Sequence, residues 1–195
     1  MNLPPNFVIR KYNKPMLGTL LKKKLSDNQL ASIFLNGIFE MVDNSFVEVV
    51  DLINDDVAFV QSPCLSAEKN GQFTMIVVVA NISSLESAFE TTQANRIERI
   101  IFEQLGSLMG KSTAEAEEKV REYQKFMSRI NHPSKNLVYA MSKSVFSKYQ
   151  LNEFQDEYFK RLQAPNPLFL KRLDQMMALF LWDWDSFFKK YKIED

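Results

Sequence analysis

The stretch "QFTMIVVVANI", residues 72 to 82, is the segment of this sequence on which the fold depends most. It is rich in β-branched and aromatic residues, and so is "VAFVQSPC" at 57 to 64. The intervening "LSAEKNG" ends in Asn70-Gly71, a turn signal. The two stretches predict an antiparallel β-hairpin near residues 57–82, and the unbroken "MIVVV" indicates that its second strand is covered on both faces. The N-terminal "FVIRKY" at 7–12 could supply a third strand, because an isolated hairpin is marginal.

Helical patterns flank this stretch on its N-terminal side. Pro15 suits the first turn of a short helix that runs to about Leu25. Ser26 and Gln29 form a capping-box pattern before apolar residues at helical spacing, which predicts a helix over 27–43. The same capping pattern at Ser45 predicts a second, separate helix that ends near residue 55.

From residue 84 onward the pattern is helical to the end of the chain. Ile97, Ile101, Leu105 and Leu108 share one face of a helix that Gly110 can end. A charged helix follows from residue 113 to the "NHPS" break at 131–134, and the "PNP" at 165–167 precedes the last helix. The predicted fold class is mainly α (α+β): a single domain over 1–195, with several helices and a small antiparallel hairpin or three-stranded sheet near residues 57–82.

Composition argues against several classes of protein. The chain has 195 residues, 46% of them hydrophobic and 25% charged, which is typical of a globular protein long enough to bury a core. It has five glycines and neither GxGxxG nor GxxxxGK[ST], so the usual glycine loops for dinucleotides and nucleoside triphosphates are missing. No apolar run of about 18 residues indicates a membrane span. A single cysteine and an N-terminus without a secretory pattern favour a cytoplasmic location.

The charge is zero overall but unevenly distributed. Six basic residues and no acidic one precede Asp27, so the rest of the chain is acidic. Such an arm could contact nucleic acid or an anionic surface, or it could simply neutralise the acidic body, with the last lysines at a helix C-terminus. The candidate contacts for an anionic partner are Arg10, Lys11, Lys22, Lys23 and Lys24.

Residues that could carry catalysis do not form a motif. His132 is the only histidine and Cys64 the only cysteine. They could pair as nucleophile and base, but a histidine in a turn and a small buried thiol is the better interpretation. Ser66 and Lys69 match S-x-x-K, but they lie in the predicted hairpin loop instead of at a rigid helix start.

The remaining candidates have simple structural explanations. Asn81-Ile82-Ser83 matches a glycosylation acceptor pattern and is interpreted as a polar strand end. Adjacent acidic residues do not share a face, so these pairs and clusters are interpreted as solvated or capping carboxylates. They are Asp55, Asp56, Glu115, Glu117, Glu118, Glu122, Asp183 and Asp185. We therefore assign no catalytic residue, cofactor or metal ligand.

The last helix, predicted over 168–191, is unusually aromatic. At helical spacing its apolar residues fall in one broad sector that suits a core face. They are Phe169, Leu170, Leu173, Met176, Met177, Phe180, Leu181, Trp184, Phe187, Phe188 and Tyr191. Leu179 and Trp182 project from the polar sector, so either another element covers them or they form an exposed interaction surface.

These observations predict a non-catalytic protein that acts by binding a macromolecule, as a regulator, adaptor or immunity-type protein does. The partner is another protein or a second copy of the chain, with Leu179 and Trp182 as the possible contact residues. The alternative is a small-molecule-binding protein or enzyme with an apolar pocket around Phe180, Trp184 and Tyr191. Binding of an anionic partner by the basic arm is the weakest of the three hypotheses.

Overall fold

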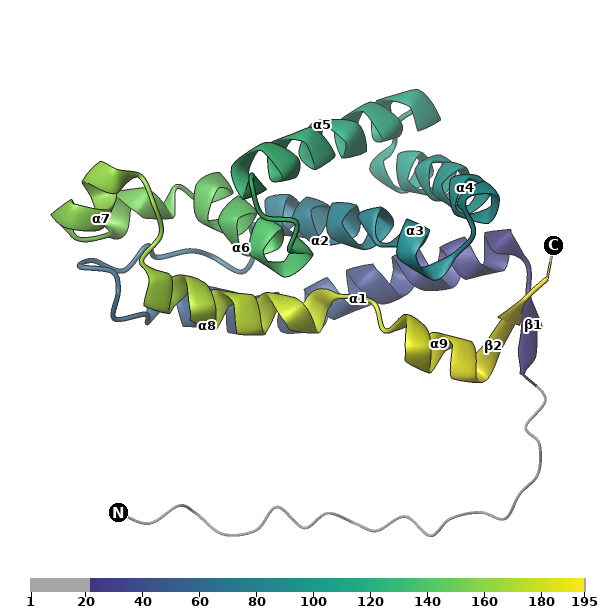
Figure 1. The fold of residues 1–195 in the computed structure, drawn as a ribbon, viewed down its shortest axis with the longest axis horizontal. Coiled ribbons are helices and arrows are strands. Elements are labelled where there is room, and N and C mark those ends of the chain that lie inside the picture. The colour runs from purple at the N-terminus through teal and green to yellow at the C-terminus, as the bar shows by residue number, and fades with distance from the viewer. Residues whose placement is uncertain (1–21, 195) are drawn as a thin grey trace, which may run out of the picture.

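The computed structural model describes residues 22–194, which form a mainly helical fold around one hydrophobic core. The elements run along the chain as β1 (Lys23–Leu25), α1 (Asp27–Asn54), α2 (Gly71–Ser83), α3 (Leu85–Ala88), α4 (Thr91–Met109), α5 (Thr113–Asn131), α6 (Leu137–Lys148), α7 (Glu157–Leu162), α8 (Pro167–Met177), α9 (Trp184–Lys190) and β2 (Tyr191–Ile193). Two 3₁₀ turns lie at Leu151–Phe154 and Ala178–Phe180. The molecule is elongated, with α7 at one end and the strands β1 and β2 at the other (Figure 1).

Helix α1 is a single helix of 28 residues, and the predicted break at 43–45 is wrong. The predicted capping box is present: Gln29 N–H donates to Ser26 Oγ at 3.3 Å, and Ser26 N–H donates to Gln29 Oε1 at 3.1 Å. Asp43 and Asn44 lie on the exposed face of the helix. The apolar stripe continues past them in register, so polar residues at these two positions do not interrupt the helix.

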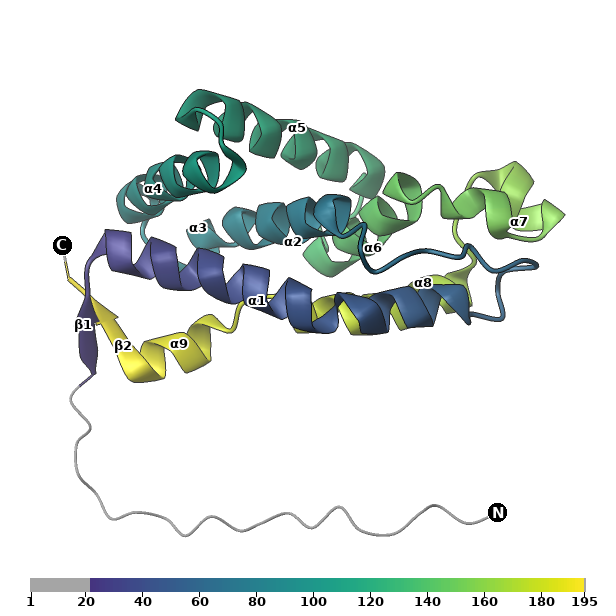
Figure 2. The ribbon, with the colours of Figure 1, turned by 180° about the vertical axis from the view of Figure 1, so that it is seen from behind.

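The predicted β-hairpin is also wrong, because residues 71–83 form the helix α2. Eight of its thirteen residues are buried, from Phe73 to Ile82, and they point in all directions around the helix axis. A helix that is apolar all round must be enclosed. Helix α2 packs against α1, α5 and α6, and it runs through the middle of the bundle when seen from behind (Figure 2).

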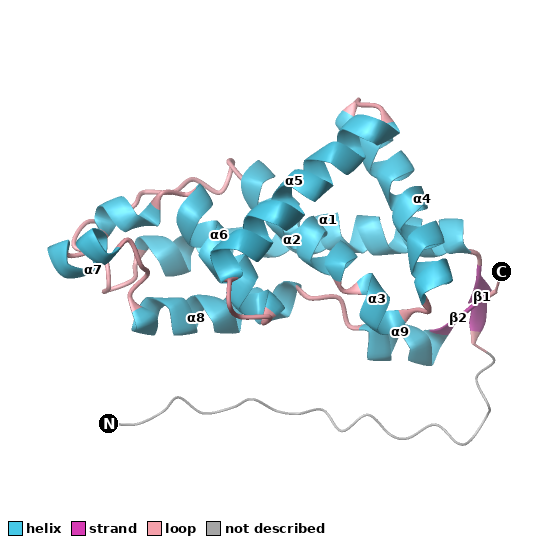
Figure 3. Cartoon of the chain, turned by 45° about the horizontal axis from the view of Figure 1, so that its top comes forward, coloured by secondary structure: helices cyan, strands magenta, loops and turns pink. Residues whose placement is uncertain are grey.

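The other β predictions have different outcomes. Residues 57–64 contain no strand, only an isolated antiparallel bridge between Phe59 and Gln155. Within residues 22–194 the sheet consists of β1 and β2, which pair in parallel with Lys23 opposite Tyr191 (Figure 3). The predicted third strand at 7–12 lies outside the described residues. The predicted helix at 15–25 lies mostly outside them, and its last residues, Lys23–Leu25, are a strand.

Several predicted boundaries are confirmed. Gly110 ends α4 with a φ of 65°, in the left-handed conformation that glycine adopts readily. Helix α5 starts at Thr113 behind a capping box of Ser112 and Glu115 and stops before His132. Pro167 is the first residue of α8. Leu108 differs from the prediction, because it is 60% exposed and does not join Ile97 and Ile101 in the core.

The predicted continuous helix over 168–191 is divided into α8, the 3₁₀ turn 178–180 and α9. The helix is interrupted at residues 180–182, where the Asn81 side chain of α2 contacts the backbone. The Asn81 side chain is fully buried, and its Nδ2 donates to the carbonyl of Phe180 at 2.8 Å while its Oδ1 accepts from the N–H of Trp182 at 2.7 Å. These bonds satisfy two backbone groups that no longer bond within a helix, so a buried amide stabilises the break.

Trp182, next to this break, packs against α1. Its ring meets Phe34 edge to face, with 5.5 Å between the ring centroids. A Cβ added to Gly37 would lie 2.5 Å from Trp182 Cζ3 and 2.7 Å from Cη2, so only glycine leaves room for the indole. Gly37 therefore accommodates the return of the C-terminal segment onto α1.

The contact between Gly37 and Trp182 predicts that the effect of Gly37→Ala on the free energy of unfolding changes sign when Trp182 is replaced by alanine. Gly37→Ala is expected to lower the free energy of unfolding by about 1–3 kcal/mol, because the added methyl overpacks the indole. In a Trp182→Ala background the same change is expected to raise it by about 0.5–1 kcal/mol, because alanine favours the helix. Urea denaturation measures both values. Gly71→Ala, with nothing within 4 Å of the added Cβ, is the control, and destabilisation by Gly37→Ala in both backgrounds would contradict the contact.

The Asn81 bridge predicts a second stability effect. Asn81→Ala is expected to lower the free energy of unfolding by about 2–3 kcal/mol, because the Phe180 carbonyl and the Trp182 N–H lose their partner. Asn95→Ala, at an exposed position of α4, is the matched control and is expected to change stability by less than about 0.5 kcal/mol. Thermal or urea unfolding of the two variants gives the comparison, and equal effects would show that the bridge contributes nothing.

Candidate functional site

The two residues predicted to form an interaction surface differ in their environments. Leu179 is 68% exposed. Trp182 is partly buried among Phe34, Trp184 and Phe187, although its indole N–H has no hydrogen-bond partner among residues 22–194. The contacts of Trp182 give it a packing role, and binding through the pair stays a prediction.

The three aromatic side chains expected to line a pocket each pack against other aromatic side chains instead. Phe180 is 1% exposed and meets Phe73 edge to face at 4.9 Å. Trp184 stacks on Phe34 at 5.4 Å and on Phe188 at 5.7 Å. Tyr191 packs on Phe187 at 4.8 Å and also borders an open hollow near β2. The ring contacts of Phe180 and Trp184 with other described residues therefore give the small-molecule alternative no support at these two positions.

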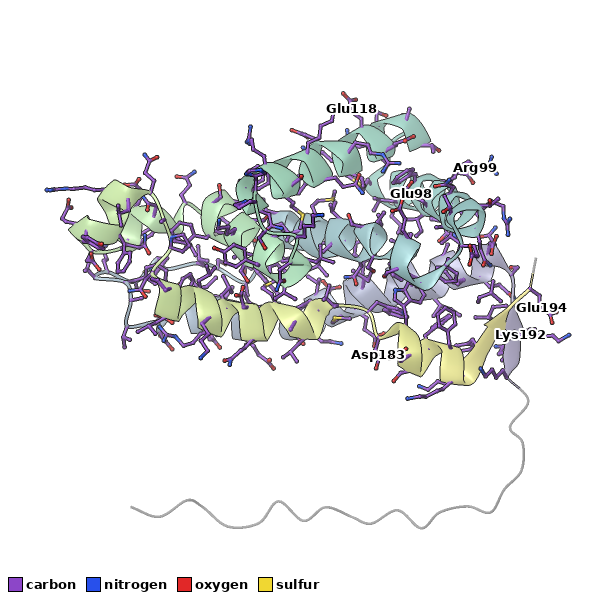
Figure 4. All side chains as sticks on the ribbon, viewed as in Figure 1. Glu98, Arg99, Glu118, Asp183, Lys192 and Glu194 are labelled. Atoms are coloured by element: carbon purple, nitrogen blue, oxygen red, sulfur yellow. The ribbon has the colours of Figure 1, made fainter. Side chains whose placement is uncertain are left out.

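The basic residues lie at the sheet end of the molecule. Lys22, Lys23 and Lys24 are exposed, and the pairing of β1 with β2 places Lys24 opposite Lys192. The Glu194 carboxylate balances part of the charge of these two lysines, since its Oε1 lies 2.9 Å from Lys24 Nζ and 3.9 Å from Lys192 Nζ. Lys192 and Glu194 lie at this end of the molecule in Figure 4. Arg10 and Lys11 lie outside the described residues. Binding of an anionic partner here stays a prediction.

The candidates for catalysis are not brought together. His132 is exposed after α5, and Cys64 is exposed in the loop after α1, so the expectation of a buried thiol is wrong. The two residues border different hollows. Ser66 lies in the same loop as Cys64 and accepts a bond from the N–H of Glu68 at 3.3 Å.

Among the acidic residues, Asp183 and Asp56 have defined roles. Asp183 caps α9 by accepting from the N–H of Ser186, and hydrogen bonding by the Ser186 side chain together with this N–H lowers the pKa of the Asp183 carboxyl. Asp56 is not solvated as predicted: its side chain is 3% exposed, and it accepts two bonds from Arg172 of α8, at 2.6 and 2.7 Å. Burial raises the pKa of Asp56, but the bonds from Arg172 and from the Ala58 N–H, with the guanidinium charge, bring it below its ordinary value of 3.8.

Exposed apolar side chains gather at the end of the molecule that carries α7. Figure 1 places α7, the first turn of α8 and the segment after α1 together at this end. Helix α7 contains no buried residue, and its Tyr158 and Leu162 are 67% and 56% exposed. We call the following five side chains the α7 end: Val57 (92% exposed), Val60 (73%), Tyr158, Leu162 and Leu168 (66%).

Buried polar bonds hold the segments of the α7 end in place. Gln155 is 2% exposed, and its side chain donates to the Ala164 carbonyl at 2.9 Å and accepts from the Asn166 N–H at 2.6 Å. The N–H of Val60 donates to the Phe154 carbonyl at 2.9 Å. The Asp56–Arg172 pair joins the same loop to α8. The exposed apolar side chains therefore stand on a backbone that is fixed on several sides.

A groove of about 740 Å³ lies between α6 and α8, beside the α7 end. Helix α6 contributes one face to it and α8 another, and the turn at 163–165 borders it. The lining side chains are Ile130, Tyr139, Lys143, Phe146, Ser147, Gln150, Asn152, Glu153, Gln163, Ala164, Pro165, Pro167, Leu170, Lys171 and Asp174.

Sequence reasoning missed both features. Val57 and Val60 belonged to a predicted strand, and α7 was one part of a longer helical stretch. The spacing of Tyr158 and Leu162, which places them on one face of a helix, was the available signal. Asp174 and Leu170 were assigned to a continuous helix, and nothing in their order along the chain indicates a groove.

Three further properties bear on the class of this protein: metal ligands, membrane-spanning helices and similarity to known proteins. Within the part of the chain that the structure describes, no three His, Cys, Asp or Glu side chains are grouped so as to hold a metal ion. No helix in residues 22–194 has both the length and the apolar character needed to cross a membrane. Comparison with known protein families, with curated proteins and with solved structures finds no match for this chain.

The Asp56–Arg172 pair predicts a pH dependence of stability. Because the pKa of Asp56 is lower in the folded than in the unfolded protein, its stabilisation is present above the ordinary pKa of 3.8 and is lost as pH falls through the folded value. Asp56→Asn is expected to cost about 1–3 kcal/mol at pH 7 and to flatten the loss of stability on acidification. Urea unfolding from pH 7 to pH 2.5 measures this effect. Asp51→Asn, at an exposed position of α1, should keep the wild-type pH profile.

Proposed function

We propose that this protein acts by binding another protein, and that the α7 end is its contact surface. The observation that carries the proposal is that segments which buried polar bonds hold together at one end of the molecule carry five exposed apolar side chains. Monomeric proteins seldom expose apolar side chains in groups, and such groups mark interaction sites more often than single exposed residues do.

The charges around the α7 end favour a protein partner over nucleic acid. Glu157 and Arg161 lie 3.7 Å apart on α7, and Lys160 lies 3.0 Å from Glu153. Both signs are therefore present and paired, whereas a surface for a polyanion needs an excess of basic side chains. Apolar centres with a balanced charged rim are typical of protein–protein interfaces.

Helix α7 itself supports the proposal. It is held by its N-cap, where Asp156 accepts from the N–H groups of Tyr158 and Phe159, and by the bonds of Gln155 on either side. None of its side chains is buried, so core packing does not explain the apolar residues that it carries. A partner that covers Tyr158 and Leu162 would explain them.

The proposal predicts that a surface variant separates folding from binding. Tyr158→Ser combined with Leu162→Ser is expected to change the free energy of unfolding by less than about 1 kcal/mol, because both side chains are exposed. The same variant is expected to weaken binding to a partner by at least about tenfold. Quantitative affinity capture from native extract identifies proteins retained by the wild type, and titration with the purified partner then gives the two dissociation constants.

Two further variants make the test specific. Leu108, near the C-terminal end of α4, is 60% exposed, so Leu108→Ser is the matched control and should bind as the wild type does. Leu179→Ser tests the surface predicted from the sequence. A partner that is lost with Leu179→Ser but kept with the Tyr158→Ser, Leu162→Ser variant would contradict the proposal. The proposal would also be contradicted if sedimentation showed that the pure protein is a dimer and that the same double variant makes it a monomer.

A further inference from the structure

We propose that the α6–α8 groove is a binding site for a small organic cation, a molecule with an apolar body and an ammonium group that pairs with Asp174. This site adjoins the α7 end but includes none of its five exposed apolar side chains. The groove of about 740 Å³ falls within the range of about 300–1,000 Å³ that is usual for small-molecule sites.

The apolar part of the site is contributed by both helices. Phe146 of α6 and Leu170 of α8 are 6% and 7% exposed, and Ile130 at the end of α5 adds a third apolar side chain. These residues belong to elements that pack against one another, α6 on α5 and α8 on α6. The groove wall is therefore part of the packed core and already has the shape that a ligand would meet.

Asp174 provides the reason to expect a positive charge. Its Oδ1 is one of four buried side-chain polar atoms without a hydrogen-bond partner among residues 22–194, and it is the only one of the four on a carboxyl group. The Asp174 residue is only partly buried, but its Oδ1 is removed from water without a donor, and this is costly because that oxygen loses solvation that nothing replaces. Asp174 also lines the groove, so a cation placed there would compensate the charge.

The other charged groups of the groove have partners or contact water. Lys143 donates to the carbonyl of Ile130 at 3.1 Å, and its ammonium lies 4.7 Å from the centre of the Tyr139 ring. Glu153 pairs with Lys160 at 3.0 Å. Lys171 is exposed on α8, three residues before Asp174. Asp174 is thus the charge in the groove that a ligand can balance.

Three probes with one fluorophore test the proposal on the full-length protein. Dansylcadaverine carries an ammonium group, N-butyl dansylamide is neutral, and dansylglycine carries a carboxylate. The rise in dansyl fluorescence on titration reports entry into an apolar site and gives the dissociation constants. The cationic probe is expected to bind the wild type about tenfold more tightly than the neutral one, as for a hydrogen bond to a charged group, and the anionic probe most weakly.

Single variants assign the preference to Asp174. Asp174→Asn is expected to remove the advantage of the cationic probe and leave the neutral probe unaffected. Asp51→Asn, which removes the same charge from an exposed position on α1, should keep the wild-type order. Lys171→Gln, which removes a competing cation from the groove, should strengthen binding of the cationic probe.

Thermal unfolding provides a readout that does not depend on the fluorophore. Asp174→Asn is expected to keep or raise the melting temperature, because the unpartnered carboxylate is lost. Dansylcadaverine should raise the melting temperature of the wild type but not of this variant. The proposal is overturned if the three probes bind the wild type equally or not at all, if the anionic probe binds most tightly, or if Asp174→Asn keeps the preference for the cation.

Discussion

The complete enclosure of α2 is the constraint on which the rest of the structure depends. This helix has apolar side chains on all sides, so α1, α5 and α6 must surround it. Its one buried polar residue, Asn81, bonds to the chain on both sides of Leu181. The same bonds end the 3₁₀ turn, start the approach to α9 and place Trp182 on Gly37. A single buried amide thus connects the centre of the bundle with the course of residues 181–194.

The two ends of the molecule are stabilised differently from this centre. At the α7 end, α7 itself buries no residue, and Gln155 and the Asp56–Arg172 pair hold the segments through buried polar bonds. Such bonds fix a backbone in one geometry while leaving apolar side chains outside. At the sheet end, two three-residue strands pair in parallel and bring lysines from both ends of the chain together.

The α6–α8 groove and the α7 end are neighbours, and the segment from Gln163 to Pro167 borders the groove before Leu168 begins the exposed surface. This segment is anchored by Gln155, whose side chain bonds to Ala164 and Asn166. This turn therefore lies beside both proposed sites, with Leu162 and Leu168 exposed on either side of it along the chain.

The sequence by itself determined the helical class, the capping box at Ser26, the stop at Gly110, the start of α5 at Thr113 and the start of α8 at Pro167, because these depend on neighbours within a few residues. Only the tertiary structure decided that residues 71–83 are a helix, since a short apolar run suits a buried strand and a buried helix equally well and the surrounding helices select one. It also decided the break at Leu181, the exposure of the α7 end and the groove beside Asp174. Each of these results from contacts between residues far apart in the chain, such as Asn81 with Trp182 and Asp56 with Arg172, and no local pattern records them.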